Sequence, residues 1–317
     1  MKPKLSVVIT PTHKWEVQEL TVSSLENQTV VDTLEFLLVC SSLEGLQFPP
    51  NWTNLPFRVI EVEDKKYVHE LRTVAVREAT GDYVVLVEDH VHLSPDWCAE
   101  LLARTEEGWA AIGGAVQPGG RRTAISEAMF LMTYGEWFQR DGDQVNAPLS
   151  GHNTAYHREL LLKLDNLEEF MACPALMQAL FRSSGEAPLF TSRVKIRHWD
   201  PAQLGAALKH LWTLGKCLGT LRTAGWSPPL RWAFSLAFPA VAAKHWLRGV
   251  LQLLRLSSRG KAPWKAAPCM LLLAGVWGLG EAYGSIKPHD AYFDQLSGLE
   301  VNRWRYTRKP DLPYDPW

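Results

Sequence analysis

The sequence predicts an α/β fold in which a mostly parallel sheet carries helices on both faces and a helical segment follows. In residues 1–200, short aliphatic and β-branched runs alternate with amphipathic stretches, and this alternation is typical of strand–helix repeats. The strand-like runs are nearly continuous in apolar residues, which indicates burial on both faces of a sheet. After Pro201 the alternation stops and long helical apolar runs take its place.

The elements follow in order along the chain. Residues 5–10 form a β-rich run that ends at Pro11, and residues 16–28 carry apolar side chains at helical spacing. Gly81 closes the second predicted helix. The strands expected after the first are at 34–39, 57–62, 82–87, 109–116 and 193–196, and the helices expected after the first are at 68–80, 97–106, 157–164 and 176–183. Residues 123–146 give a mixed pattern that places no element.

Composition sets the class of protein. The 317 residues are 46% hydrophobic and 21% charged, enough for one large or two ordinary cores, which excludes a disordered or fibrous protein. The chain has 33 basic and 34 acidic residues, so overall charge gives no case for nucleic-acid binding. Five widely spaced cysteines without a C-x-x-C pair favour a reducing, cytoplasmic environment. The short apolar run near the N-terminus predicts no signal peptide.

The charges are unevenly distributed. Residues 1–200 contain 18 basic and 28 acidic side chains, whereas residues 201–285 contain 10 basic ones and a single acid, Glu281. The basic segment is also rich in Trp and Leu. Its apolar stretches are interrupted or shorter than a membrane-spanning helix, so we expect it to lie on an anionic membrane surface. The alternative is a buried helical subdomain in a cytoplasmic protein, whose Lys and Arg stems reach solvent. We therefore divide the chain into residues 1–200, 201–285 and a tail at 286–317.

The sharpest cluster of polar residues is Glu88-Asp89-His90, directly after the apolar strand at 82–87. Ligands bind beyond the carboxyl ends of strands in parallel sheets. Two carboxylates and an imidazole there suit a divalent cation, Mg²⁺ or, with the imidazole, Mn²⁺. The alternative is that these residues solvate the strand end or cap the helix near Trp97.

Several motifs resemble those of one family. The run Leu5-Ser-Val-Val-Ile-Thr-Pro-Thr12, residues 71–76 and residues 79–83 are similar to the first strand, a helix and the Gly-Asp-Tyr strand entry of the family 2 glycosyltransferases. Glu88-Asp89-His90 occupies the place of the family's Asp-x-Asp motif. Residues 150–158 resemble its Gly-x-Asn-x-Ala-x-x-Arg segment, and residues 194–198 resemble its strand ending in His. Together these motifs cover about two-thirds of the chain.

The resemblance implies a Rossmann-like nucleotide-sugar-binding fold, called GT-A, and an inverting glycosyltransferase of the membrane-associated bacterial type. It implies a nucleotide-diphosphate sugar as donor and Mn²⁺ or Mg²⁺ as cofactor. The membrane surface expected for residues 201–285 would place the enzyme on the cytoplasmic face of the membrane, and that location would fit a lipid-linked or envelope glycan as acceptor. The metal ligands would be Asp89, His90 and His198. The donor site would contain Pro11, Thr12, Ser41, Arg72, Glu88, Asp89, Gly151, His152 and Asn153.

Some of these residues also have structural interpretations. Arg72 is equally suited to a salt bridge, Asn153 to a helix cap, and His198 to core packing beside Trp199.

The sequence departs from the family's pattern at three places. Cys40-Ser41-Ser42 stands where the family has acidic residues for the nucleoside. Glu88 and His90 replace the two aspartates of the metal motif, which leaves metal-independent activity open. Cys173-Pro174 stands where the catalytic acidic pair is expected, so Glu169, then Glu168, and further Asp165, become the candidate bases. A catalytically inactive scaffold and a soluble enzyme acting on a small molecule are the rival interpretations.

Overall fold

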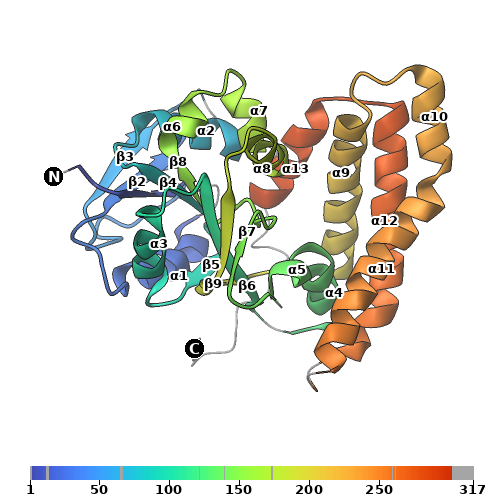
Figure 1. Ribbon diagram of the computed structural model, residues 1–317, viewed down its shortest axis with the longest axis horizontal. Coiled ribbons are helices and arrows are strands. Elements are labelled where there is room, and N and C mark those ends of the chain that lie inside the picture. Colours follow the sequence, from blue (N-terminus) through green and yellow to red (C-terminus); the bar gives the residue numbers. More distant parts are fainter. Residues whose placement is uncertain are drawn as a thin grey trace. The chain divides into compact units, whose positions relative to one another are not determined.

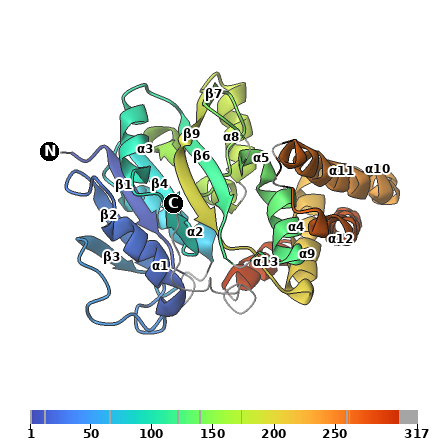
Figure 2. The same cartoon turned by 90° about the horizontal axis from the view of Figure 1, so that it is seen from below.

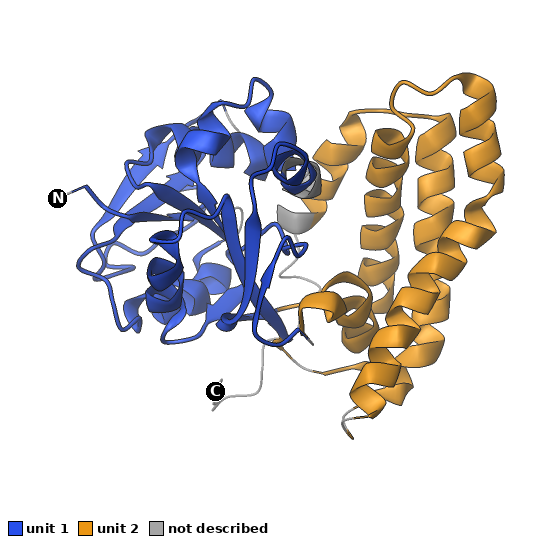
Figure 3. Ribbon diagram, viewed as in Figure 1, with its two compact units in different colours: residues 1–117, 140–198, 315–317 blue, residues 118–139, 199–314 orange. Residues whose placement is uncertain are grey.

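The computed structural model describes residues 2–11, 14–64, 67–120, 122–138, 140–172, 174–258, 260 and 262–301 (Figure 1). The chain divides into two compact units, shown in Figure 3. Unit 1 comprises residues 1–117, 140–198 and 315–317, and unit 2 comprises residues 118–139 and 199–314. Residues 118–139 thus belong to the same compact unit as the C-terminal helices.

Unit 1 is built around a sheet. Its strands are β1 (Leu5–Ile9), β2 (Glu35–Cys40), β3 (Phe57–Glu61), β4 (Tyr83–Val87), β5 (Val91–Leu93), β6 (Ala111–Pro118), β7 (Asp143–Val145), β8 (Ala155–His157) and β9 (Pro188–His198). Its helices are α1 (Trp15–Glu26), α2 (Val68–Glu78), α3 (Trp97–Thr105), α6 (Arg158–Leu162), α7 (Leu167–Ala172) and α8 (Pro174–Ser183). Helices α1 and α3 lie on one face of the sheet, and α2 and α6 lie on the other (Figures 1 and 2).

The nine strands are ordered β3-β2-β1-β4-β8-β6-β9-β5, with β7 beside β9. Strands β3, β2, β1 and β4 are parallel, as predicted. From β4 onward, the pairs β4–β8, β6–β8, β5–β9 and β7–β9 are antiparallel. The predicted fold class, an α/β sheet with helices on both faces followed by a helical segment, is confirmed, with the parallel pairing concentrated in its first half.

The parallel strands form because their side chains leave water on both faces of the sheet. Every residue of β1 and β4 is buried. At about 25 cal/mol per Å² of apolar surface, such fully buried runs supply a large share of the favourable free energy of folding. Because these strands are fully buried, their ends hold the polar residues that follow them in fixed positions.

The short strand β5 was not predicted from the sequence, and α1 holds it in place. Thr21 Oγ donates to the carbonyl oxygen of Val91 at 2.7 Å and accepts from the amide of Val91 at 3.2 Å. Ser24 Oγ accepts from the amide of Leu93 at 3.2 Å. The buried hydroxyls of α1 therefore satisfy backbone groups of β5 as a neighbouring strand would.

Unit 2 consists of helices. They are α4 (Ala124–Thr133), α5 (Gly135–Phe138), α9 (Leu204–Arg222), α10 (Pro228–Leu236), α11 (Phe238–Ser257), the 3₁₀ turn η1 (Trp264–Ala266), α12 (Ala267–Ile286) and α13 (Ala291–Val301). Helix α4 falls in the stretch that the sequence left unplaced. It begins with a capping box in which Thr123 and Ser126 each accept from the other's backbone amide.

Helices α9 and α12 pack at close range through glycine. A Cβ atom on Gly219 would lie 2.1 Å from the carbonyl oxygen of Glu281, and one on Gly284 would lie 2.1 Å from that of Lys216. Only glycine permits such an approach. The buried carboxylate of Glu281 is contacted by Arg222 and by His245 Nε2, the latter at 2.7 Å. Unit 2 therefore has an interior with specific polar contacts.

Within the described residues, one segment, Trp264–Ile286, is long and apolar enough to cross a membrane, with a mean hydropathy of 1.3. Of an apolar 18-residue stretch of this segment, 56% is buried inside the protein. A core helix of a bundle has the same length and composition, so this property alone is weak support for a span.

Candidate active site

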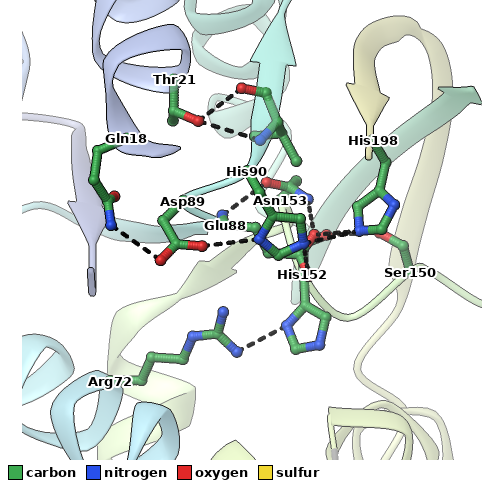
Figure 4. A network of polar contacts seen from close by, with 11 residues as sticks. Gln18, Thr21, Arg72, Glu88, Asp89, His90, Ser150, His152, Asn153 and His198 are labelled. Atoms are coloured by element: carbon green, nitrogen blue, oxygen red, sulfur yellow. Dashed lines mark hydrogen bonds and ion pairs between the residues drawn. The ribbon is translucent and has the colours of Figure 1, made fainter. Parts of the chain in front are cut away.

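The candidate site lies in unit 1, where β4 ends and Glu88-Asp89-His90 begins (Figure 4). Strand β5 follows these three residues and pairs with the last residues of β9, so that Val91 lies opposite His198. This register brings an imidazole from the far end of the domain beside the acidic residues. Glu88 and Asp89 are buried, and His198 is fully buried.

Glu88, His90 and His198 form a cluster whose ligand atoms all lie within 4.8 Å of one another. The Nε2 atoms of the two histidines are 3.1 Å apart. Glu88 Oε1 lies 3.9 Å from His90 Nε2, and Glu88 Oε2 lies 3.7 Å from His198 Nε2. One carboxylate oxygen and two imidazole nitrogens facing a common point suit a divalent transition-metal ion, and imidazole ligands favour Mn²⁺ over Mg²⁺.

Asp89 lies beside this cluster and contacts it through His90. Its Oδ1 is 2.8 Å from His90 Nδ1, and its Oδ2 accepts from Gln18 Nε2 at 3.2 Å. An ionised carboxylate only accepts, so His90 donates from Nδ1 and, when neutral, keeps the lone pair of Nε2 for the cluster. The structure thus places Glu88 with the two predicted histidines, and it places Asp89 where a carboxylate orients a metal-binding histidine.

Asn153 fixes the carboxylate of Glu88. Its Nδ2 donates to Glu88 Oε2 at 2.8 Å, and its Oδ1 accepts from the amide of Glu88 at 3.0 Å. Asn153 reaches these atoms from a turn in which its own φ is +56° and that of Gly151 is +83°. Asparagine tolerates this left-handed conformation better than most residues do. Tyr156 supports the turn by donating to the carbonyl oxygen of Gly151 at 2.8 Å.

Arg72 and His152 meet next to this turn. Arg72 is buried in α2, and its Nη1 lies 2.8 Å from His152 Nδ1. A guanidinium only donates, so His152 Nδ1 accepts and the ring is neutral in this contact. Figure 4 shows the pair below the cluster of Glu88, His90 and His198. The guanidinium adds a fixed positive charge to a site that otherwise holds two carboxylates.

The remaining predicted residues lie as follows. Pro11 is buried and follows β1 after Thr10, and Ser41 is half-buried directly after β2. Glu168 and Glu169 are exposed in the first turn of α7, where Glu169 Oε2 accepts from Asn166 Nδ2 at 3.3 Å. Asp165 is exposed just before that helix. Thr12 and Cys173 lie outside the described residues.

Sequence reasoning did not find Gln18. Gln18 lies on α1, is fully buried, and donates a hydrogen bond to Asp89 Oδ2, the carboxylate oxygen that His90 does not contact. A buried glutamine among the apolar positions of a predicted helix was the available signal, since a buried amide needs partners. The close distance of Glu88 to both histidines had no sequence signal, because it depends on the register of β5 with β9.

Comparison with known proteins gives a family match over part of the chain. The family model described as "Glycosyl transferase family 2" matches residues 44–165. The match contains β4, the Glu88-Asp89-His90 segment and the Gly151–Asn153 turn. No curated protein sequence gives a significant match.

Three solved structures are similar to this chain at low sequence identity. The mannosyltransferase PcManGT of Pyrobaculum calidifontis, in complex with GDP-Man and Mn²⁺, has 15% sequence identity and a TM-score of 0.49, and the alignment covers 95% of this chain and 88% of that one. Residues 1–349 of TarS from S. aureus, in complex with UDP, give 15% identity, a TM-score of 0.47, and coverage of 87% and 92%. A further structure of S. aureus TarS gives 15% identity and a TM-score of 0.46, with 84% of this chain covered. The chain spans 55% of the length of that last protein.

Proposed function

We propose that this chain, in which residues 44–165 match glycosyl transferase family 2 and the sheet has the arrangement of the GT-A fold, is a glycosyltransferase that moves a sugar from a nucleotide-diphosphate donor to a hydroxyl group of a lipid-linked or envelope glycan. The observation that carries the proposal is the cluster of Glu88, His90 and His198 beyond the carboxyl end of β4. Ligands of open α/β sheets bind at this edge.

A divalent cation, Mn²⁺ in preference to Mg²⁺, is the cofactor that this cluster fits. Glu88, His90 and His198 would hold it, and Asp89 and Asn153 would hold the ligands in place. When bound, such an ion supplies positive charge next to a diphosphate leaving group. The protein's own contribution is to keep one carboxylate and two imidazoles close together, with His90 and Glu88 each held by a further side chain.

The donor diphosphate would lie between the cluster and Arg72. The buried guanidinium and the neutral ring of His152 are a charge and a polar group close to the carboxylate of Glu88. Arginine suits phosphate because its planar donors match two oxygens at once. Pro11, Thr12, Ser41 and Gly151 complete the proposed donor site, with hydroxyl and backbone groups near Ser41 in place of an acidic contact to the nucleoside.

Glu169 is our proposed general base, with Glu168 and Asp165 as the alternatives. The base takes the proton of the acceptor hydroxyl while that oxygen attacks the anomeric carbon, the bond to the diphosphate breaks, and the configuration inverts. General-base assistance contributes about 10²- to 10⁴-fold in rate. Glu169→Gln is therefore expected to lower the turnover rate by that factor with little effect on donor affinity. An unchanged rate would move the role to Glu168 or Asp165.

The acceptor and the location belong together in this proposal. Residues 201–285 carry ten basic side chains and one acidic one, and we propose that this segment holds the enzyme at the cytoplasmic face of an anionic membrane. A lipid-linked acceptor would be presented at that surface. The division into a GT-A domain at 1–200, this segment and a tail at 286–317 is part of the same proposal.

The test is to incubate the purified protein with a panel of nucleotide sugars and Mn²⁺, with and without lipid acceptors, and to measure the nucleoside diphosphate released. We expect release with one donor, and we expect Asp89→Ala to abolish turnover because His90 loses its orienting carboxylate. Donor binding without any release, with every acceptor, would instead support an inactive scaffold. Equal turnover with small water-soluble acceptors alone would support a soluble enzyme.

A further inference from the structure

The outward faces of α10 and α11 in unit 2 are unusually apolar for a surface. None of the residues of α10 is buried, and its Trp232 and Leu236 are 57% and 76% exposed. On α11, Leu247, Leu251 and Leu254 are each about half exposed, at 52%, 45% and 51%. Exposed apolar patches of this kind mark interaction sites.

The leucines of α11 form a stripe. Residues 247, 251 and 254 are spaced four and three apart, so they lie on one side of the helix. The opposite side is the one packed inside unit 2, and its buried residues are His245, Gly249, Gln252, Leu253 and Leu256. Helix α11 therefore has an apolar outward side opposite its buried side, and only the buried side is covered within the described residues of the chain.

The charge beside the stripe indicates what covers it. Lys244 and Arg255 are exposed and lie on one flank of the stripe, less than a quarter turn from its centre by helical spacing. From Pro228 to Ile286 the sequence has seven Lys or Arg and a single acid, Glu281. Glu281 is fully buried and is contacted by Arg222 and His245. Its carboxylate is therefore not exposed at this surface, where the exposed charges named above are basic.

We propose that the outward faces of α10 and α11 are the surface by which the protein binds an anionic lipid bilayer. We call Leu230, Trp232, Leu236, Leu247, Leu251 and Leu254 the docking face. The leucines and Trp232 enter the boundary between headgroups and acyl chains, while Lys244 and Arg255 contact the anionic headgroups. This inference rests on the membrane location in the proposed function and specifies the residues that produce it.

The packing inside unit 2 gives a different role to Trp264–Ile286, the segment that is long and apolar enough to cross a membrane. Its helix, α12, packs so closely on α9 that only glycine fits at the contact. It also places Glu281, which contacts His245, in the interior of unit 2. Inserting α12 across a bilayer would separate these contacts and expose a buried carboxylate to lipid. Attachment is therefore peripheral, through α10 and α11.

The test is co-sedimentation of the full chain with phosphatidylcholine vesicles that contain or lack phosphatidylglycerol, at low and high salt. The wild-type protein should bind the anionic vesicles at low salt and be released at high salt. Leu247→Glu with Leu251→Glu should weaken binding at least about tenfold. Lys244→Gln with Arg255→Gln should weaken binding to anionic vesicles about 25-fold at low salt, because each lost charge lowers the affinity about fivefold. Leu180→Glu, at an exposed leucine of α8 that is 39% accessible, is the matched control and should bind as the wild type does.

Three results would overturn the inference. The first is retention of the protein in the membrane pellet after alkaline carbonate extraction, which would show that α12 is inserted. The second is a dimer in light scattering that Leu251→Glu dissociates, without vesicle binding by the wild type, because a second copy of the chain would then cover the face. Thermal protection of the same variants by nucleoside diphosphate is measured in parallel. Protection that persists while vesicle binding fails refutes the docking face and leaves the proposed sugar transfer intact.

Discussion

Asn153 offers the sharpest test of how the site is held together. Its side chain makes two hydrogen bonds to Glu88, and its backbone has a φ of +56°. Asn153→Gly removes both hydrogen bonds and keeps a residue that adopts the left-handed conformation without strain. Asn153→Ala removes the same bonds and adds the backbone strain.

The expected magnitudes follow from these contacts. A hydrogen bond to a charged group contributes about 1.5–3 kcal/mol and a neutral one about 0.5–1.5 kcal/mol, so Asn153→Gly should lower the free energy of unfolding by about 2–4 kcal/mol. The left-handed conformation costs a residue with a Cβ about 1–2 kcal/mol, so Asn153→Ala should be less stable than Asn153→Gly by about that amount. Loss of a residue that orients a metal ligand typically lowers metal affinity by about 10–100-fold, which we expect for Mn²⁺ in both variants.

Chemical denaturation measures the stability, and isothermal titration with Mn²⁺ measures the affinity. Asn146→Gly is the matched control, because Asn146 also has a left-handed φ, +60°, but is exposed outside the cluster. It should change neither quantity appreciably. If Asn153→Gly binds Mn²⁺ as tightly as the wild type does, the hydrogen bonds to Glu88 do not position a metal ligand and the reasoning fails.

Three further predictions concern stability and reactivity. Burial alone would raise the pKa of Glu35, but hydrogen bonds from Ser6 and Thr80 and the charge of Arg58 outweigh it and lower that pKa. The stabilisation is therefore present above the unfolded pKa of 4.5 and is lost as pH falls through the folded pKa. In urea denaturation, Glu35→Gln should cost about 1–3 kcal/mol at neutral pH and much less in acid, and an equal loss at both pH values would contradict this. Gly114→Ala should destabilise unit 1 by about 3 kcal/mol or more, because the new Cβ would lie 2.0 Å from the carbonyl oxygen of Val194, whereas Gly45→Ala, with only ordinary contacts, should be nearly neutral in the same assay. Burial raises the pKa of the Cys98 thiol to about 12, so at pH 8 Cys98 should be labelled by a thiol reagent only on unfolding, and rapid labelling of the native protein, mapped by mass spectrometry, would contradict its burial.

The first half of the sheet could be predicted because its information is local. Strands such as β1 and β4 are apolar along their whole length, and every residue of each is buried, so hydrophobic pattern and structure agree residue by residue. The helices α1 and α2 follow the same rule. Gly81, which was expected to close the second helix, lies beyond the end of α2 at Glu78, and it marks instead a close approach, since a Cβ there would lie 2.6 Å from Ser6 Oγ.

The elements that sequence missed depend on contacts distant in the chain. Strand β5 is three residues long and contains His92 in its middle. Its pairing with β9 and its hydrogen bonds to Thr21 and Ser24 define it. Helix α4 did carry a local signal, the Thr123–Ser126 capping box, but the Gly-rich basic loop before it obscured the start of the helix.

The candidate site was predictable as a set of residues and unpredictable in its geometry. Polar residues after a buried strand indicate where a ligand binds, and the resemblance to a family added His198 and Asn153. The distances among Glu88, His90 and His198 depend on the register of β5 with β9. Asp89, which we expected among the metal ligands, contacts His90 Nδ1 and Gln18 Nε2 in the structure.

The most direct test of the central claim is the Mn²⁺-dependent thermal protection of the protein by nucleoside diphosphates. Because a ligand bound only to the native state stabilises it by about 2.7 kcal/mol at a hundred times its Kd, one nucleoside diphosphate should raise the Tm clearly more with Mn²⁺ than without it. Glu88→Gln and His198→Gln should each lose this Mn²⁺-dependent part. Protection that is the same with and without Mn²⁺, and the same in both variants as in the wild type, would contradict a metal–diphosphate site at the end of β4.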